Sequence, residues 1–340
     1  MAVDRRTAIA AVVLTSMFQA GCAKAARRTP SPPKGWAPFA ARFLAPEGRI
    51  VDTGNGGISH SEGQGYGMVL AEAAGDRGSF ERLWAWTDSH LARKDMRLFS
   101  WRYDPNATPA VTDTNNATDG DLLIAWALLR AADRWGVSAY ADASRQIRDA
   151  ILRKLVKPVG SRVVLMPGLE GFLNGGVATL NLSYYIWPAL DAFRKADGAG
   201  WSAIIADGQA ILSRARFGPH RLPSDWIDIR PQDAITPAAG RPPRFGFDAV
   251  RVPLYLYWGG RSEALEPFRA YWMPFKAAGQ APPAWIDVVT GEVAPYPLSA
   301  GGMAVAALTV TRKLPETVAL PDDYFAGVLT VLAQAAAGSQ

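Results

Sequence analysis

The sequence has few cysteines and histidines, and it lacks the common phosphate-binding motifs. It contains one cysteine and three histidines in 340 residues. A single cysteine cannot form an internal disulfide, and the histidines have no spacing typical of metal ligands. There is no P-loop and no GxSxG nucleophile elbow, and the glycines within 63–67 lack the spacing of a dinucleotide-binding turn. We therefore expect neither a metal nor another cofactor.

The net positive charge of the chain is confined to its N-terminus. The net charge is +5, and the six basic residues within 1–34 are opposed by Asp4 alone, so the rest of the chain is balanced. A balanced domain offers no basic face to a phosphate backbone, which argues against a nucleic-acid partner. The chain also lacks an apolar run long enough to predict a transmembrane helix.

The first 25 residues have the pattern of an export signal. Arg5 and Arg6 precede a short apolar segment, 7–18, and small residues follow it. This pattern predicts a signal peptide over 1–25 and a periplasmic or secreted protein. Two alternatives stay open: the arginine pair also resembles a twin-arginine signal, and Cys22 stands where a lipoprotein signal carries its lipid anchor.

A proline-rich, polar linker over 26–35 is expected to lead into a single catalytic domain over 36–340. In that domain, helical patterns alternate with loops rich in Gly, Pro and Asn. Helices are expected at 36–45, 66–76, 79–92, 120–135, 139–156, 179–195, 200–214, 249–258, 262–276, 300–312 and 322–337. Short extended pieces are expected at 98–103 and 162–166. The long proline-rich connection 217–247 is expected to lie over a functional site.

Two of these helical segments are apolar on every side, which predicts that other helices surround them. They are residues 122–129 (LLIAWALL) and 250–258 (VRVPLYLYW). Segment 139–156 is amphipathic and is expected on the outside. The sequence therefore predicts an all-α fold in which an outer ring of helices wraps an inner ring.

Three acidic residues lie beside the starts of predicted helices. Residues 61–68 read SEGQGYGM and place Glu62 in a glycine-rich segment before a helix expected from Tyr66. Asp119 precedes the apolar segment at 122, and Asp248 precedes the one at 250. If the inner helices run parallel, their N-termini bring the three carboxylates together at one end of the ring.

Each acid also has an ordinary structural interpretation. Glu62 fits a solvated loop, Asp119 fits a helix N-cap, and Asp248 fits an ion pair with Arg251 three residues later. His60 is interpreted as a hydrogen-bond partner beside Glu62 rather than as a metal ligand. The functional interpretation is a set of paired carboxylates with aromatic platforms, and glycoside hydrolysis is the common reaction that needs only those groups.

Four segments resemble glycoside hydrolase family 8, in the same order along the chain. Residues 61–68 look like the general-acid motif of that family, 117–135 like its long signature, and 247–253 like the segment that carries its general base. Residues 181–184 (NLSY) are similar to an Asn-Pro-Ser-Tyr segment, with Leu182 in place of the proline. The resemblance implies an (α/α)6 barrel and inverting hydrolysis of β-1,4 chains such as cellulose, chitosan or xylan.

The resemblance also implies roles for individual residues. Glu62 would be the general acid and Asp248 the general base. Asp119 would bind the sugar and the transition state, and Tyr184 would hold the catalytic water. Inversion requires the two catalytic carboxyl groups to lie about 6.5–9.5 Å apart. Further substrate contacts are expected from Trp101, Arg251, Trp187, Trp226, Gln64 and Tyr66.

An aspartate base at position 248 resembles the subgroup that contains endoglucanases of bacterial cellulose-synthesis operons. This implies a cellulase that trims nascent β-1,4-glucan beside the cellulose synthase export complex. A chitosanase or xylanase of the same family and a non-catalytic glucan-binding protein stay as alternatives. A terpene-cyclase-like helical toroid fits less well, because residues 119–121 (DGD) lack the further acids that such sites use.

Overall fold

The computed structural model describes residues 31–314 and 320–339. The predicted signal peptide over 1–25, including Cys22, lies outside the described residues and stays a prediction. The same is true of the first half of the linker predicted over 26–35.

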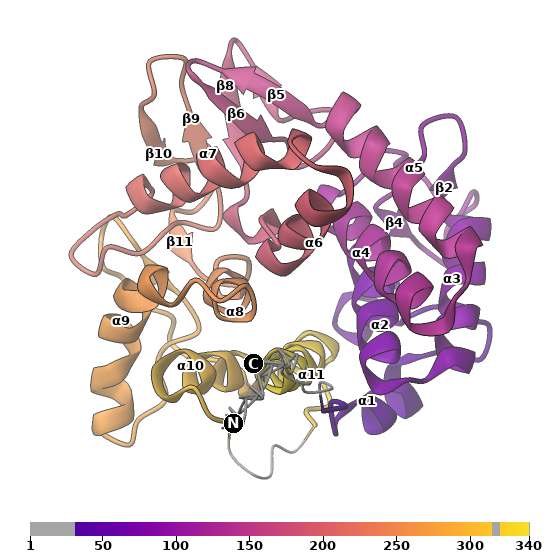
Figure 1. The fold of residues 1–340 in the computed structure, drawn as a ribbon. Helices are drawn as coiled ribbons and strands as arrows, with labels where there is room; N and C mark the ends of the chain where they lie inside the picture. Colours follow the sequence, from indigo (N-terminus) through magenta and orange to yellow (C-terminus); the bar gives the residue numbers. More distant parts are fainter. Residues whose placement is uncertain (1–30, 315–319, 340) are drawn as a thin grey trace, which may run out of the picture.

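Eleven α-helices make up nearly half of the described chain, and each overlaps one of the predicted segments (Figure 1). Their bounds are α1 (Trp36–Phe43), α2 (Ser61–Ala74), α3 (Arg77–His90), α4 (Thr118–Trp135), α5 (Ser138–Lys154), α6 (Trp187–Asp197), α7 (Gly200–Arg214), α8 (Arg251–Trp258), α9 (Glu266–Ala277), α10 (Ala300–Thr311) and α11 (Tyr324–Gly338).

The helices form two concentric layers around a common centre (Figure 1). Helices α2, α4, α6, α8, α10 and α11 contact one another in that order, and α11 contacts α2 again, which closes an inner ring. Helices α3, α5, α7 and α9 pack on α2, α4, α6 and α10, while α1 packs on α2 and α11. The predicted double ring, an (α/α)6 barrel, is confirmed.

The burial of individual helices explains this arrangement. The apolar segments 122–129 and 250–258 fall in α4 and α8, where nearly every residue is buried. Helix α5 instead buries one face, which includes Tyr140, Ile147 and Ile151. An apolar helix gains most from full enclosure and an amphipathic helix from one covered face, so the sequence pattern sorts the helices between the two rings.

Helix α2 begins earlier than the expected start at Tyr66. It starts at Ser61, because the ring of His60 caps it: His60 Nδ1 accepts the N–H of Gly63 at 3.0 Å. Glu62 therefore lies in the first turn of α2 and not in a loop before it. The predicted start is wrong because a glycine-rich first turn reads as a loop in sequence.

The predicted helix 179–195 is wrong at its N-terminal end. Residues 177–180 form strand β8, and residues 182–184 form a short 3-10 turn. Helix α6 starts only at Trp187, with Pro188 in its first turn, where the missing N–H costs no helical hydrogen bond.

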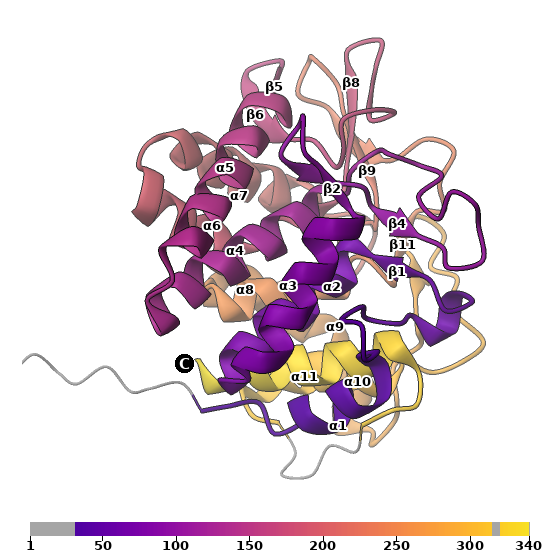
Figure 2. The same ribbon diagram turned by 90° about the vertical axis from the view of Figure 1, so that its right-hand side faces the viewer.

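Short antiparallel strands connect the helices, and β1, β4, β9 and β11 lie together along one side of the ring (Figure 2). The pairs are β1 (Ser59–His60) with β4 (Arg102–Tyr103), β2 (Ala92–Arg93) with β3 (Leu98–Phe99), β5 (Val156–Val159) with β6 (Arg162–Leu165), and β11 (Arg244–Phe245) with β12 (Ile286–Asp287). A four-stranded sheet has the order β10 (Ile235–Pro237), β9 (Ile227–Ile229), β8 (Val177–Leu180) and β7 (Leu173–Asn174). The extended pieces predicted at 98–103 and 162–166 are confirmed.

Helices α2 and α4 approach each other at two glycines. A Cβ atom on Gly65 would lie 2.5 Å from a leucine side chain of α4, and one on Gly120 would lie 2.7 Å from the Cβ of Ser61. A larger residue at either position would push the two helices apart. The glycines therefore allow a close helix contact, which brings the first turns of α2 and α4 side by side.

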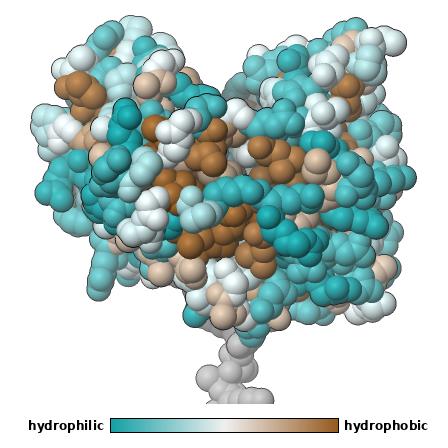
Figure 3. Space-filling view, turned by 90° about the horizontal axis from the view of Figure 1, so that it is seen from above, coloured by the Kyte–Doolittle hydropathy of each residue, from teal (hydrophilic) through white to brown (hydrophobic). Residues whose placement is uncertain are grey.

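One face of the molecule is seen in a space-filling view (Figure 3). The face seen in Figure 3 is largely hydrophilic, with apolar side chains gathered near its middle and a notch at one edge. None of the helices within 31–314 and 320–339 combines the length and the hydropathy that crossing a membrane requires.

Candidate active site

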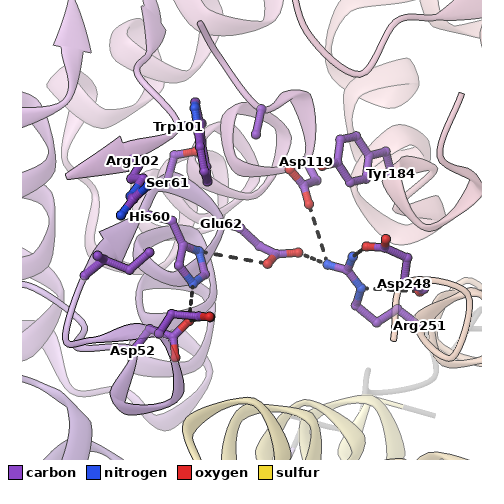
Figure 4. A pocket seen from close by; sticks show the side chains of 13 residues that line it. Asp52, His60, Ser61, Glu62, Trp101, Arg102, Asp119, Tyr184, Asp248 and Arg251 are labelled. Carbon is purple, nitrogen blue, oxygen red and sulfur yellow. Dashed lines mark hydrogen bonds and ion pairs between the residues drawn. The ribbon is translucent and has the colours of Figure 1, made fainter. Parts of the chain in front are cut away.

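A cavity of about 500 Å³ lies where α2, α4 and α8 begin. Its walls include Glu62, Asp119, Tyr184, Asp248 and Arg251, as Figure 4 shows. The other lining residues are Asp52, Asn55, Ile58, His60, Ser61, Trp101, Arg102 and Ala117. The structure thus brings together the three predicted carboxylates, which lie far apart in the sequence.

Glu62 is held at one of its two carboxylate oxygens. Tyr66, one turn along α2, donates its hydroxyl to Oε1 at 3.0 Å, and Arg251 pairs with the same oxygen. His60 Nδ1 lies 3.9 Å from Oε2. The side chain keeps 19% of its surface exposed and lines the cavity. The solvated-loop interpretation of Glu62 is therefore wrong.

His60 has the predicted structural role of a hydrogen-bond partner. Because Nδ1 accepts the N–H of Gly63, a neutral ring carries its proton on Nε2, which faces Asp52 Oδ2 at 3.4 Å. Burial raises the pKa of Asp52, but the hydrogen bonds from His60 and Asn55 outweigh it and leave this pKa below its ordinary value. The ring therefore links the start of α2 to an ionised carboxylate.

Asp119 lies in the first turn of α4 and is almost fully buried, with 4% of its side chain exposed. Its Oδ1 accepts the N–H of the adjacent Gly120 at 2.9 Å, and Ala117, not Asp119, is the N-cap residue of the helix. The N-cap interpretation is therefore wrong. Burial raises the pKa of Asp119 to about 7. The carboxyl group reaches the cavity, where it is available to hydroxyl groups of a bound ligand.

Asp248 lies at the turn before α8, with each carboxylate oxygen bound. Trp226 Nε1 donates to Oδ2 at 3.1 Å, and Arg251 pairs with Oδ1 at 2.5 Å. Burial raises the pKa of Asp248 to about 7, and the charges of Asp225 and Asp119 add to this rise, while hydrogen bonds to the carboxylate oppose it. A carboxyl group with such a pKa can take up a proton near neutral pH, as a general base must.

Arg251, the first residue of α8, connects the three acids. One terminal nitrogen pairs with Glu62 and lies 3.6 Å from Asp119, and the other pairs with Asp248. The expected Asp248–Arg251 ion pair is present, but the same cation also bridges to the other acids. The carboxyl groups of Glu62 and Asp248 therefore face each other across one guanidinium group (Figure 4).

Tyr184 and Trp101 line the cavity, as their predicted contacts with a ligand require. Burial, and then the charges of Asp119 and Asp248, hold the pKa of Tyr184 well above its usual range, so its hydroxyl group stays protonated. Trp101 donates its Nε1–H to Asp113 at 2.7 Å, which fixes the indole at the cavity wall.

Three predicted substrate contacts are wrong, because these side chains are buried and do not line the cavity. The amide of Gln64 accepts the N–H of Ile50 at 2.6 Å inside the core. The hydroxyl group of Tyr66 donates to Glu62 on α2 and accepts from Arg251 on α8. Trp187 packs under the guanidinium of Arg261, 4.5 Å from its ring centre.

Trp226 also contacts an acid rather than the cavity. Its ring stacks nearly parallel to Phe172, with 5.7 Å between centroids, and the guanidinium of Arg241 lies 4.0 Å from its centre. Because Trp226 belongs to the connection 217–247, this connection contacts the candidate site through Asp248, and its predicted place over a functional site stays a prediction.

Sequence reasoning missed Asp225 and Asn181. One oxygen of Asp225 receives three backbone N–H groups from the turn that carries Asp248. The amide of Asn181 lowers the pKa of Asp248. The only signal for Asp225 was its place beside Trp226 in the long connection. Within the described residues, no group of three or more His, Cys, Asp or Glu side chains is arranged to hold a metal ion.

Several known proteins are similar to this chain over most of its length. An endoglucanase from Cellulomonas uda is 46% identical over 281 residues, which are 82% of this chain and 78% of that protein. The structure of a family 8 endoglucanase from Klebsiella pneumoniae superposes with a TM-score of 0.86 at 43% identity, over 89% of this chain and 98% of that one. An endo-β-1,4-glucanase structure from Acetobacter xylinum also gives 0.86, at 42% identity, over 91% and 98%.

The family description "Glycosyl hydrolases family 8" matches residues 2–339, almost the full length. The sequence segments, the double ring of helices and the cavity with its three carboxylates agree with that match. The chain belongs to glycosyl hydrolase family 8.

Proposed function

We propose that this protein is an endo-1,4-β-glucanase that hydrolyses cellulose chains with inversion at the anomeric carbon. The observation that carries the proposal is the position of Glu62 and Asp248 on opposite sides of the Arg251 guanidinium, in one cavity. Membership in family 8 and the names of the similar endoglucanases support the same activity.

In the proposed reaction, Glu62 gives its proton to the glycosidic oxygen as the bond from that oxygen to the anomeric carbon breaks. Asp248 takes a proton from a water molecule, whose oxygen forms the new bond to the anomeric carbon from the opposite face. One water is consumed, and Glu62 and Asp248 return to their starting states by exchanging protons with solvent.

The neighbouring groups orient the reactants. Tyr184 remains a hydrogen-bond donor because its pKa is held high, which suits a role in holding the attacking water. Asp119 faces the same cavity and would bind hydroxyl groups of the distorted sugar more strongly in the transition state than in the ground state. Arg251 keeps both catalytic carboxyl groups in place before substrate enters.

The biological setting follows from the sequence and is part of the proposal. The export-signal pattern of residues 1–25 supports a periplasmic or secreted enzyme, with a lipid anchor on Cys22 as the alternative. We propose that the catalytic domain spans 36–340 and trims nascent β-1,4-glucan beside the cellulose synthase export complex.

Two single variants test the activity. Glu62→Gln and Asp248→Asn keep the shape of each side chain but remove the proton donor and the base, so each should lose about 10²–10⁴-fold in turnover of carboxymethylcellulose. Circular dichroism checks that the fold is kept. Near-normal hydrolysis by Glu62→Gln would refute the assignment, and faster wild-type hydrolysis of chitosan or xylan would move the substrate to those polymers.

The stereochemistry gives a separate test. An inverting enzyme releases the α-anomer at the new reducing end, which NMR detects before mutarotation. Initial release of the β-anomer would contradict the assignment of Asp248 as a base that activates water.

A further inference from the structure

The turn that presents Asp248 is anchored by the half-buried carboxylate of Asp225. Asp225 Oδ1 accepts the backbone N–H groups of Gly246 at 3.0 Å, Asp248 at 3.2 Å and Ala249 at 2.7 Å. The backbone N–H of Asp225 also donates to the carbonyl of Arg244 at 2.6 Å. The segment around Asp225 and the turn before α8 are therefore joined in both directions.

The carboxylate of Asp225 accepts hydrogen bonds from backbone N–H groups and does not form an ion pair with any described residue. No ion pair within 4.0 Å joins Asp225 to a cation in residues 31–314 or 320–339. Burial raises the pKa of Asp225 to about 6, although the three N–H groups and the charge of Arg244 oppose the rise. A carboxylate that is largely removed from water and has no paired cation is costly unless it accepts hydrogen bonds, and here Oδ1 accepts three from the turn.

Two adjacent residues therefore fix both the backbone and the side chain of Asp248. Asp225 holds its backbone N–H, and Trp226 holds its carboxylate at Oδ2. Since Arg251 fixes the other oxygen, the carboxyl group has a defined direction toward the cavity. Without Asp225, three backbone N–H groups of the turn would lose their acceptor, and one of them belongs to Asp248, whose carboxyl group must point at the water.

We propose that Asp225 is a positioning residue of the reaction, which fixes the turn that presents the base Asp248 to the cavity. This inference rests on the proposed function, in which Asp248 activates the water. Asp225 does not line the cavity, so it acts through the turn and not on the substrate.

The charge of Asp225 has a second effect that can be measured. The groups that act on Asp248 are the acids Asp225 and Asp119, the cation Arg251, and the donors Asn181 and Trp226; Tyr184 also faces it. The negative charge of Asp225 disfavours ionisation of Asp248 and so raises its pKa. Removing that charge while keeping the oxygen acceptor should lower the pKa of Asp248, and the base would stay active at lower pH.

The experiment uses the full-length enzyme with two substitutions. Asp225→Ala removes the acceptor, and kcat on carboxymethylcellulose should fall about 10²-fold, because displacing a catalytic group by about 1 Å has an effect of that size. KM should change less than about threefold, since the cavity lining is untouched. Asp225→Asn keeps an oxygen acceptor, so it should restore most of kcat and move the acidic limb of the kcat–pH profile to lower pH.

Asp228→Asn is the matched control. Asp228 is a buried aspartate of the nearby strand β9, but it accepts from Thr179 Oγ1 at 2.7 Å and from the N–H of Ala239 at 3.0 Å, not from the turn. This control should keep the wild-type kcat and pH profile. The inference is overturned if Asp225→Ala keeps the wild-type kcat, or if Asp225→Asn leaves the acidic limb where it is.

Two further measurements distinguish a folding defect, an error in the positioning role of Asp225 and an error in the proposed function. If Asp225→Ala does not fold by circular dichroism, the shift of the acidic limb in Asp225→Asn alone decides the outcome. Glu62→Gln and Asp248→Asn run beside these variants: if they lose activity while the Asp225 variants do not, only the positioning role falls. If they keep activity, the proposed function itself falls.

Discussion

The two proposed catalytic carboxylates are supported in different ways. Glu62 belongs to a helix, and α2 is locked against α4 by the close contacts at Gly65 and Gly120. Asp248 belongs to a turn, and its position depends on polar contacts from a distant segment. Packing fixes the helix that carries the acid, so disturbing this support should lower the stability of the fold. Hydrogen bonds fix the base, so its support should fail through loss of rate before loss of stability.

Arg251→Met should have the largest effect, because it removes the one cation that both sides share. Breaking a buried ion pair destabilises a protein by about 3–5 kcal/mol. A carboxyl group whose folded-state pKa is raised weakens folding once it ionises, so wild-type stability falls as the pH rises from the ordinary value of 3.8 toward the raised value of about 7. Arg251 offsets part of this cost by pairing with the ionised carboxylates, and the variant loses that compensation only at a pH where they are ionised. Urea unfolding should therefore show a larger loss at pH 8 than at pH 5.

The control for that variant is Arg77→Met. Arg77 pairs with Glu81 at 2.7 Å on the surface of α3, where both side chains are about half exposed. An exposed pair contributes about 0–1 kcal/mol. If the loss of stability in Arg251→Met were as small as in this control, or the same at both pH values, Arg251 would not be the common support of the two acids.

The same contrast explains what the sequence could predict. Apolar and amphipathic periods sort helices between two rings, and an acid near a helix start is visible as a local pattern, so the barrel and the grouping of Glu62, Asp119 and Asp248 could be predicted. The anchor of Asp248 could not, because the donors to Asp225 are backbone N–H groups, which every residue except proline carries. No residue type marks such a contact.

The wrong substrate contacts have a related cause. Gln64 and Trp187 stand near the motifs, but sequence proximity does not give the direction of a side chain. Gln64 points from α2 into the core, where Ile50 and Thr87 satisfy its amide. Trp187 begins α6 with its ring enclosed. Which face of a helix borders a cavity depends on how the ring closes, and this is a long-range property.

Gly65→Ala should have the next largest effect and test the packed side. The added methyl group would lie 2.5 Å from the Cβ of Leu123, so α2 and α4 would have to separate. Overpacking of this kind typically destabilises a fold by about 1–3 kcal/mol. Thermal unfolding measures the change, and Gly78→Ala in α3 is the control, since its Cβ would have no neighbour nearer than 3.9 Å. The control should be neutral or stabilising by up to about 1 kcal/mol.

Trp226→Phe should have the smallest effect and test the polar side. It keeps an aromatic ring beside Phe172 but removes the N–H that donates to Asp248 Oδ2. One lost hydrogen bond of about 0.5–1.5 kcal/mol corresponds to a fall in kcat at pH 7 of about 2–10-fold. Stability should change little.

The direction of the pH change separates this variant from a general disturbance of the turn. The hydrogen bond from Trp226 lowers the pKa of Asp248, so its loss should move the acidic limb of the kcat–pH profile to higher pH, opposite to the shift expected for Asp225→Asn. Trp36→Phe is the control. It removes a similar indole N–H, which donates to Asp76 elsewhere in the barrel, and it should leave the kcat–pH profile unchanged. Shifts in the same direction for the variants at 225 and 226 would mean that both merely loosen the turn, and that charge and hydrogen bonding do not tune the base separately.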